Sequence, residues 1–126
     1  MHIIITHKGD FKKTEKFLTG AQKLNVRSIL NRYGEQGVNA LSLATPIDSG
    51  VTASSWSYRV FQTQKGYQIS WFNSHEENGV MPAILIQYGH GTKGGTYVEG
   101  IDYINPALKP IFNQIARAIN EEVSRL

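Results

Sequence analysis

The tripeptide Asp48-Ser49-Gly50 matches the catalytic core of aspartic proteases. In a retroviral-type dimer, two such aspartates share one proton across a two-fold axis. That chemistry needs an apolar strand leading into the aspartate. Here Thr45-Pro46-Ile47 precedes the aspartate, and proline is disfavoured in a central strand because it has no N–H to donate to the neighbouring strand. A dimeric protease using Asp48 is therefore kept as an alternative, and we expect the carboxylate to be structural.

A second candidate, His75-Glu76-Glu77, begins like the zinc-binding helix of metalloproteases. That motif places a second histidine four residues after the first, and this chain has Gly79 there. The four histidines are widely separated along the sequence. We therefore expect no metal site and no cofactor.

The glycine-rich segment and the serines also lack the neighbouring residues that known catalytic and phosphate-binding motifs require. Lys93 is followed by Gly94, so the segment from Gly89 to Thr96 is not a phosphate-binding loop. Ser54 and Ser55 lack the Gly-x-Ser-x-Gly setting of a serine nucleophile. The chain has no cysteine, which excludes a thiolate nucleophile and a disulfide framework. We expect no catalytic residues and no enzymatic activity.

The totals favour a single soluble domain over residues 1–126. The net charge is +3, but the 13 basic residues are scattered and do not alternate with aromatics, so a small basic nucleic-acid-binding domain is only an alternative. No apolar run approaches the roughly 20 residues that span a bilayer. No segment has the pattern of a signal peptide, so we expect synthesis in the cytoplasm and no membrane partner.

The first half of the chain predicts a strand followed by two helices. Residues 2–6 are β-branched and predict a short strand. Residues 10–18 and 25–44 carry apolar side chains at helical spacing, and Thr45-Pro46 ends the second helix. Gly34 and Gly37 interrupt that helix. They either kink it or let a neighbouring element approach closely.

The second half predicts strands and a long final helix. Two runs of alternating residues, 56–61 and 67–72, flank a short loop with Gly66 and predict a β-hairpin. Residues 83–88 predict a third apolar strand, and residues 73–80 and 89–100 predict loops, the second one flexible. Asn105 predicts an N-cap with Pro106 in the first turn of the last helix.

The last helix carries one continuous apolar stripe that predicts core packing. The stripe consists of Leu108, Ile111, Phe112, Ile115, Ile119, Val123 and Leu126. The predicted fold is therefore α+β. It is an antiparallel sheet of about four strands, with the N-terminal helices and the long C-terminal helix packed on one face.

The order of these signals carries a family resemblance. A helix ends in Ala44-Thr45-Pro46-Ile47-Asp48-Ser49-Gly50, and Ser54-Ser55-Trp56 then opens a hairpin. Ile84-Leu85-Ile86-Gln87-Tyr88-Gly89-His90-Gly91 comes later, and Pro106 opens the final helix. Over residues 25–126 this order resembles the small neck and tail-completion proteins of tailed bacteriophages and prophages. Gln87 stands where that family often has Glu, and His90 interrupts its Tyr-Gly-Thr run.

The resemblance implies a structural subunit of the head–tail connection in the virion, made in the bacterial cytoplasm. It implies partners of two kinds: further copies, in a hexameric or dodecameric ring, and other neck and tail proteins. Thr45, Pro46, Asp48, Ser49 and Gly50 are then a structural turn, in which Gly50 can take a positive φ and redirect the chain from helix into strand. The candidate interface residues of the two loops are His75, Glu76, Glu77, Tyr88, Gly89, His90, Gly91 and Lys93.

Overall fold

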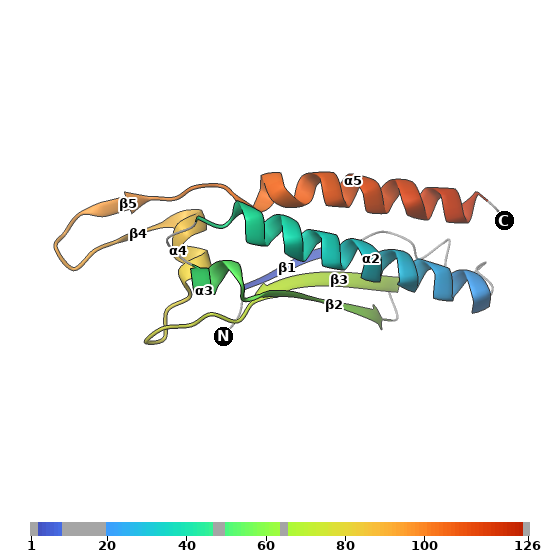
Figure 1. The fold of residues 1–126 in the computed structure, drawn as a ribbon, viewed down its shortest axis with the longest axis horizontal. Helices are drawn as coiled ribbons and strands as arrows, with labels where there is room; N and C mark the ends of the chain where they lie inside the picture. Colours follow the sequence, from blue (N-terminus) through green and yellow to red (C-terminus); the bar gives the residue numbers. More distant parts are fainter. Residues whose placement is uncertain (1–2, 9–19, 47–49, 64–65, 125–126) are drawn as a thin grey trace.

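The computed structural model describes residues 3–8, 20–46, 50–63 and 66–124, and these form a mixed helix and sheet structure (Figure 1). The described elements run β1 (Ile3–Lys8), α2 (Gly20–Ala44), α3 (Gly50–Ala53), β2 (Trp56–Thr63), β3 (Gly66–Asn73), α4 (Pro82–Tyr88), β4 (Gly89–Gly91), β5 (Tyr97–Glu99) and α5 (Ile104–Val123). The short helix predicted over residues 10–18 lies outside the described residues.

The predicted hairpin of residues 56–72 is confirmed and forms the middle and one edge of a three-stranded antiparallel sheet. Strand order is β1-β3-β2, so the first strand of the chain pairs with the second strand of the hairpin. In the register, Trp71 of β3 lies opposite Tyr58 of β2 and Ile5 of β1. Strand β3, in the middle of the sheet, is buried along most of its length, with Tyr67, Ile69 and Trp71 in the hydrophobic core.

The prediction of about four strands in one sheet is wrong, because the expected third strand of residues 83–88 is the helix α4. Short apolar runs fit a buried strand and a buried helix turn equally well by pattern. Pro82 sits at the first helical position, where its fixed φ and missing N–H favour a helix. Ala83 and Gln87, four residues apart, are the buried side chains of this helix.

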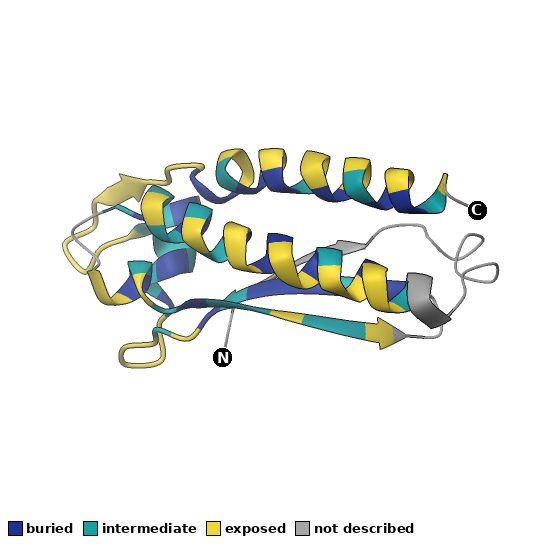
Figure 2. Ribbon diagram, turned by 45° about the vertical axis from the view of Figure 1, so that its right-hand side comes forward, coloured by how far each residue is buried: buried dark blue, intermediate teal, exposed yellow. Residues whose placement is uncertain are grey.

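The long helices α2 and α5 lie side by side and antiparallel, on the same side of the sheet (Figure 1). Their inward surfaces are buried and their outward surfaces are exposed (Figure 2). The stripe predicted for α5 is confirmed over its described part, with Leu108, Ile111, Ile115 and Ile119 buried, and Leu126 lies outside the described residues. Phe112 of α5 packs against Trp71 of β3 with ring centroids 5.7 Å apart. The core is thus shared by both helices and the sheet.

The glycines of α2 are explained by close packing, which is one of the two alternatives left by the sequence. The helix continues without interruption through Gly34 and Gly37. A Cβ at Gly34 would overlap the ring of Tyr58, and a Cβ at Gly37 would overlap the indole of Trp71. Trp71 also donates its indole N–H to the carbonyl oxygen of Gly34 at 2.9 Å. Both glycines therefore let aromatic rings of the sheet reach the helix backbone.

Candidate functional site

Thr45 and Trp56, at the two ends of the predicted structural turn, contact each other directly. The buried hydroxyl of Thr45 donates to the carbonyl oxygen of Leu41 at 2.6 Å. The same hydroxyl accepts the indole N–H of Trp56 at 2.9 Å. This pair of bonds fixes the C-terminal end of α2 against the start of β2, so the threonine and tryptophan of the motif form a structural joint.

Between these ends the chain differs from the predicted turn. Gly50 is the first residue of α3 and does not adopt a positive φ, so the predicted role for that glycine is wrong. The chain therefore enters β2 through a short helix. Asp48 and Ser49 lie outside the described residues, and their predicted structural role stays a prediction.

A chain of polar contacts joins α3 to the segment after β3. Nδ1 of His75 lies 2.7 Å from the hydroxyl oxygen of Thr52, and its Nε2 lies 3.0 Å from a carboxylate oxygen of Glu77. A hydroxyl, an imidazole and a carboxylate in series are the components of a nucleophilic site. The Thr52 side chain, however, is 0% exposed, so no substrate can reach the hydroxyl in this arrangement. Sequence reasoning missed Thr52, because 23 residues separate it from His75 and no motif joins them.

Asn73 completes this network from the end of β3. Its side-chain amide donates to the carbonyl oxygen of Thr52 at 2.8 Å and accepts the backbone N–H of His75 at 3.0 Å. Buried polar groups that are fully paired in this way hold one conformation. The group Thr52, Asn73, His75 and Glu77 therefore anchors the following turn to α3.

The predicted loop of residues 73–80 is a tight hairpin-like turn. Glu77 and Val80 exchange two backbone hydrogen bonds of 2.9 Å across Asn78-Gly79. Asn78 and Gly79 both have positive φ, at 52° and 77°, as a type I′ turn requires. The candidate interface residues Glu76 and Glu77 are exposed on this turn, whereas His75 is half-buried beneath it.

Gln87 joins α4 to the start of α5. Its side-chain oxygen accepts the backbone N–H groups of Tyr103 and Ile104, both at 3.1 Å, and its amide donates to Asp102 at 2.8 Å. These N–H groups have no partner within their own helix. The prediction of Asn105 as the N-cap is wrong, because the helix begins at Ile104 and the buried Gln87 supplies the acceptor.

Tyr103 reinforces the same joint. Its hydroxyl donates to the carbonyl oxygen of Ala83 in α4 at 3.0 Å. Burial disfavours the phenolate and raises the pKa of Tyr103 to about 12. The segment around Gln87, which sequence reasoning assigned to a strand beside a loop, thus forms a second structural joint.

The segment predicted as a flexible loop, residues 89–100, is a narrow antiparallel hairpin of β4 and β5, which we call the arm. Gly89 pairs with Glu99, and Gly91 pairs with Tyr97. Gly89 has a φ of 80°, and a Cβ there would lie 2.5 Å from the Tyr97 hydroxyl, so glycine is required for this chain direction. The arm projects from the end of the molecule that carries α3 and α4 (Figure 1).

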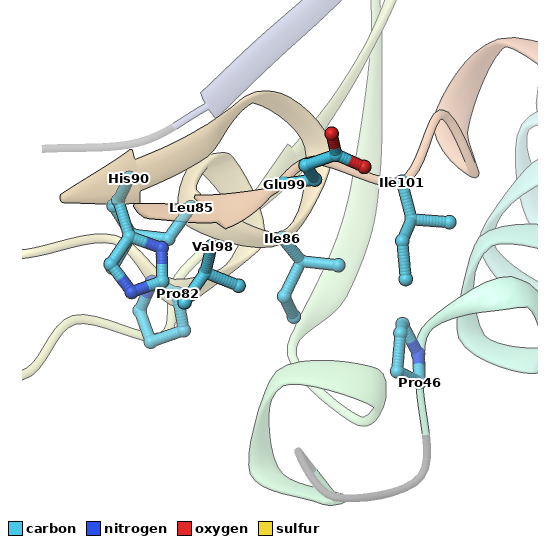
Figure 3. Close-up of a pocket in the computed structure, with 8 residues that line it drawn as sticks. All are labelled: Pro46, Pro82, Leu85, Ile86, His90, Val98, Glu99 and Ile101. Carbon is cyan, nitrogen blue, oxygen red and sulfur yellow. The ribbon is translucent and has the colours of Figure 1, made fainter. Parts of the chain in front are cut away.

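An apolar hollow of about 320 Å³ lies at the base of the arm (Figure 3). The lining residues come from the end of α2, from α4 and from the arm with the segment after it: Pro46, Pro82, Leu85, Ile86, His90, Val98, Glu99 and Ile101. Nδ1 of His90 is buried and has no hydrogen-bond partner among the described residues. The walls of the hollow are therefore mostly apolar, and His90 and Glu99 are the polar residues among them.

The two sets of candidate interface residues lie at the same end of the molecule, although 11 positions separate Glu77 from Tyr88 in the sequence. The turn that carries His75, Glu76 and Glu77 and the arm that begins after Tyr88 both extend from the end formed by α3 and α4 (Figure 1). Tyr88, Gly91 and Lys93 are exposed there, and Gly89 and His90 are half-buried. The structure thus brings together two segments that were predicted as separate loops.

The described part of the chain contains no group of three or more histidine, aspartate or glutamate side chains placed to hold a metal ion. None of its helices is long and apolar enough to cross a membrane.

Comparison with known proteins gave no relative. No family model matches the sequence, and no curated protein and no solved structure matches it either.

Proposed function

We propose that the chain is a non-enzymatic structural subunit of the head–tail connection of a tailed bacteriophage or prophage. In this role it assembles by protein–protein contacts into a ring of six or twelve copies and binds neighbouring neck and tail proteins. The proposal starts from the resemblance carried by residues 44–56, 84–91 and Pro106. The geometry of the described residues in these segments supports it.

The observation that carries the proposal is the use of the motif residues as joints. Thr45 bonds Trp56 at 2.9 Å and so connects α2 to the sheet. Gln87 accepts two N–H groups at the start of α5 and so connects α4 to the last helix. The polar groups of catalytic residues face a cavity that a substrate can reach. The polar groups of Thr45 and Gln87 are instead hydrogen-bonded to other parts of the chain inside the fold.

The shape of the molecule agrees with an assembly role. The arm and the turn of residues 74–80 extend from one end, beyond the packed helices and sheet (Figure 1). Extended segments that contribute little to their own core are typical of proteins whose neighbours complete the contact. Exposed apolar side chains gather at this end, which is the composition of a protein-binding surface.

The location of the protein in particles tests the proposal. Virions made by the phage or prophage that encodes the chain are purified, and the chain is sought by mass spectrometry and by labelling in electron micrographs. We expect it at the junction between head and tail. Deletion of its gene is expected to leave filled heads and free tails that do not join. Joined, infectious particles that lack the chain would contradict the proposal.

A substitution at Asp48 separates this role from the protease alternative. Asp48→Asn removes the carboxylate that a shared-proton mechanism requires but keeps the size of the side chain and one oxygen that can accept hydrogen bonds. Under the proposed function, particles carrying Asp48→Asn join heads to tails at the wild-type frequency. A loss of joining in a variant that folds and enters the particle would favour the enzyme.

A further inference from the structure

The turn after β3 contains the dipeptide Asn78-Gly79, which is chemically labile. Asn78 is the only asparagine of the sequence that is followed by glycine. The backbone nitrogen of the residue after an asparagine can attack the side-chain amide carbon, and glycine hinders this attack least because it has no Cβ. Asparagine is accordingly one of the thermolabile residues of proteins. The dipeptide therefore joins a susceptible side chain to the least hindered backbone nitrogen.

The reaction open to this dipeptide is a ring closure followed by hydrolysis. The Gly79 nitrogen forms a bond to Cγ of Asn78, the bond from Cγ to the amide nitrogen breaks, and ammonia leaves with the proton of the Gly79 N–H. Water then opens the cyclic imide. If the new bond breaks, the product is aspartate. If the original peptide bond breaks, the product is isoaspartate, in which the main chain runs through Cβ and Cγ.

The structure leaves Asn78 accessible to this reaction. Residues 76–80 are all exposed, and the turn is closed by two backbone hydrogen bonds of 2.9 Å between Glu77 and Val80. Ring closure requires rotation about the Cα–C bond of Asn78 out of the turn conformation, so the turn must first open. Opening an exposed turn of this kind costs little free energy, because it exposes no buried side chain of residues 76–80.

The neighbouring dipeptide Asn73-Ser74 has the same type of side chain in a protected setting. The Asn73 side chain is 0% exposed, and its amide donates to the carbonyl oxygen of Thr52 at 2.8 Å. The nitrogen that would attack it, in Ser74, donates its N–H to the carbonyl oxygen of Ser55 at 3.2 Å. Both reacting groups are held in place, so deamidation at Asn73 requires the end of β3 to come apart.

The isoaspartate product is incompatible with the closed turn. A type I′ turn joins its two strands through two residues of ordinary backbone length. Isoaspartate adds one carbon atom to the main chain between Glu77 and Val80, so their two hydrogen bonds lose their geometry. A carboxylate oxygen of Glu77 also lies 3.0 Å from Nε2 of His75, and this contact depends on the position of the turn.

We propose that Asn78 is a site of spontaneous deamidation, and that its isoaspartate product opens the turn and releases Glu77 from His75. The reaction needs only water and the folded chain, so it goes beyond the proposed function and does not depend on it. It adds a negative charge to the exposed turn that carries the candidate interface residues Glu76 and Glu77.

Peptide mapping by mass spectrometry tests the site. The full chain is incubated at mildly alkaline pH, once in its native state and once unfolded in guanidinium chloride, and deamidation is followed at each asparagine. We expect folding to slow the reaction at Asn78 by less than about tenfold and at Asn73 by more than about a hundredfold, because an exposed turn opens far more often than a buried strand end. Equal slowing at both sites, or a native Asn78 that stays intact, would overturn the proposal.

Asn78→Gln is the matched control for the chemistry. The same attack on glutamine would have to close a larger ring, which is much slower, while the side chain keeps its amide group. We expect no deamidation at this position in the variant over the same incubation. Deamidation of the native variant at the rate of the native wild type would place the reaction at another residue and overturn the proposal.

Asn78→Asp separates the new charge from the change in the main chain. Aspartate followed by glycine also forms type I′ turns, so this variant carries the charge on an ordinary backbone. Hydrogen exchange of the Val80 amide and the NMR signals of the His75 ring report whether the turn is closed. We expect both to match the wild type in Asn78→Asp.

The isoaspartate form, purified by chromatography from the aged wild type, should behave differently. Its Val80 amide is expected to exchange at least about tenfold faster, because the hydrogen bond to Glu77 is lost, and its His75 signals should shift. Circular dichroism confirms that the purified form is still folded. Exchange and signals equal to those of Asn78→Asp would show that isoaspartate leaves the turn closed, and would overturn that part of the proposal.

Discussion

At the scale of single residues, the chain depends on a few buried polar side chains that connect elements distant in sequence. Gln87 and Thr45 are the clearest cases. Gln87 accepts two backbone N–H groups at the start of α5, and the Thr45 hydroxyl accepts the indole N–H of Trp56. Removing one partner of such a bond leaves the other buried and unpaired, which costs more than the bond itself contributes.

Gln87→Leu tests the joint between α4 and α5. The substitution keeps the approximate volume but leaves the N–H groups of Tyr103 and Ile104 without their acceptor. We expect a loss of about 1–3 kcal/mol in the free energy of unfolding, measured by urea denaturation. Gln114→Leu, at an exposed position of α5, serves as the control and should change stability by less than about 0.5 kcal/mol. Equal stability of both variants would contradict the capping role.

Tyr103 gives the fold a dependence on alkaline pH. Its folded-state pKa of about 12 lies above the ordinary value of 10.0, so the folded chain holds the phenolic proton more tightly than the unfolded chain does. The stabilisation is therefore complete below pH 10 and is lost as the pH rises towards 12. Unfolding measured between pH 9 and pH 12 should show a steeper loss of stability for the wild type than for Tyr103→Phe. If the stability of the wild type and of Tyr103→Phe fell equally with pH, burial would not raise the pKa of Tyr103.

At the scale of elements, the contact between α2 and the sheet limits which residues the helix can carry. Trp71 is 0% exposed, and Tyr58 is only half-buried at the edge of the sheet. Both rings rest against glycines of α2. The two glycines should therefore differ in their tolerance of a methyl group.

Gly37→Ala is expected to destabilise the chain by about 1–3 kcal/mol, because the enclosed indole of Trp71 cannot move aside. Gly34→Ala should cost less, since the ring of Tyr58 can shift towards solvent and alanine favours the helix by about 1 kcal/mol. Denaturant unfolding of both variants, with Gln36→Ala at an exposed position of α2 as control, measures the difference. Stabilisation by Gly37→Ala would show that the backbone contact is loose.

At the scale of the whole molecule, the helices and sheet around the core determine the free energy of unfolding, and the arm contributes little to it. The core joins α2, α5, the sheet and α4, and it takes no described side chain from residues 89–99. The arm lies beyond this body: β5 is exposed along its whole length, whereas Gly89 and His90 of β4 are half-buried. Stability and assembly should therefore respond to different substitutions.

Replacing residues 92–96 with an Asn-Gly turn shortens the arm and tests this separation. We expect the free energy of unfolding to change by less than about 1 kcal/mol, because exposed hairpin tips contribute little to a core. A chemical denaturation curve checks the stability, and a large loss would show that the arm is part of the folding unit. The replacement keeps Tyr88 and the lining of the hollow.

The sequence alone determined the elements whose signals are local. Alternation over residues 56–61 and 67–72 predicted the hairpin, and the stripe from Leu108 to Val123 predicted α5 and its buried side. These patterns report which side of an element is buried, and burial is what stabilises that element. Thr45-Pro46 marked the end of α2 correctly, because proline excludes the helical conformation from the residue before it.

The tertiary structure decided what local pattern leaves open. An apolar run as short as residues 83–88 suits a strand or a helix turn, and here Pro82, Gln87 and the start of α5 select the helix. Gly34 and Gly37 acquired their meaning only from the rings of Tyr58 and Trp71, which lie 24 and 34 positions further along. The hollow is built from α2, α4 and the arm, so no single segment of sequence contains it. Contacts between residues far apart in the chain depend on how the elements pack, and that packing is a property of the whole fold.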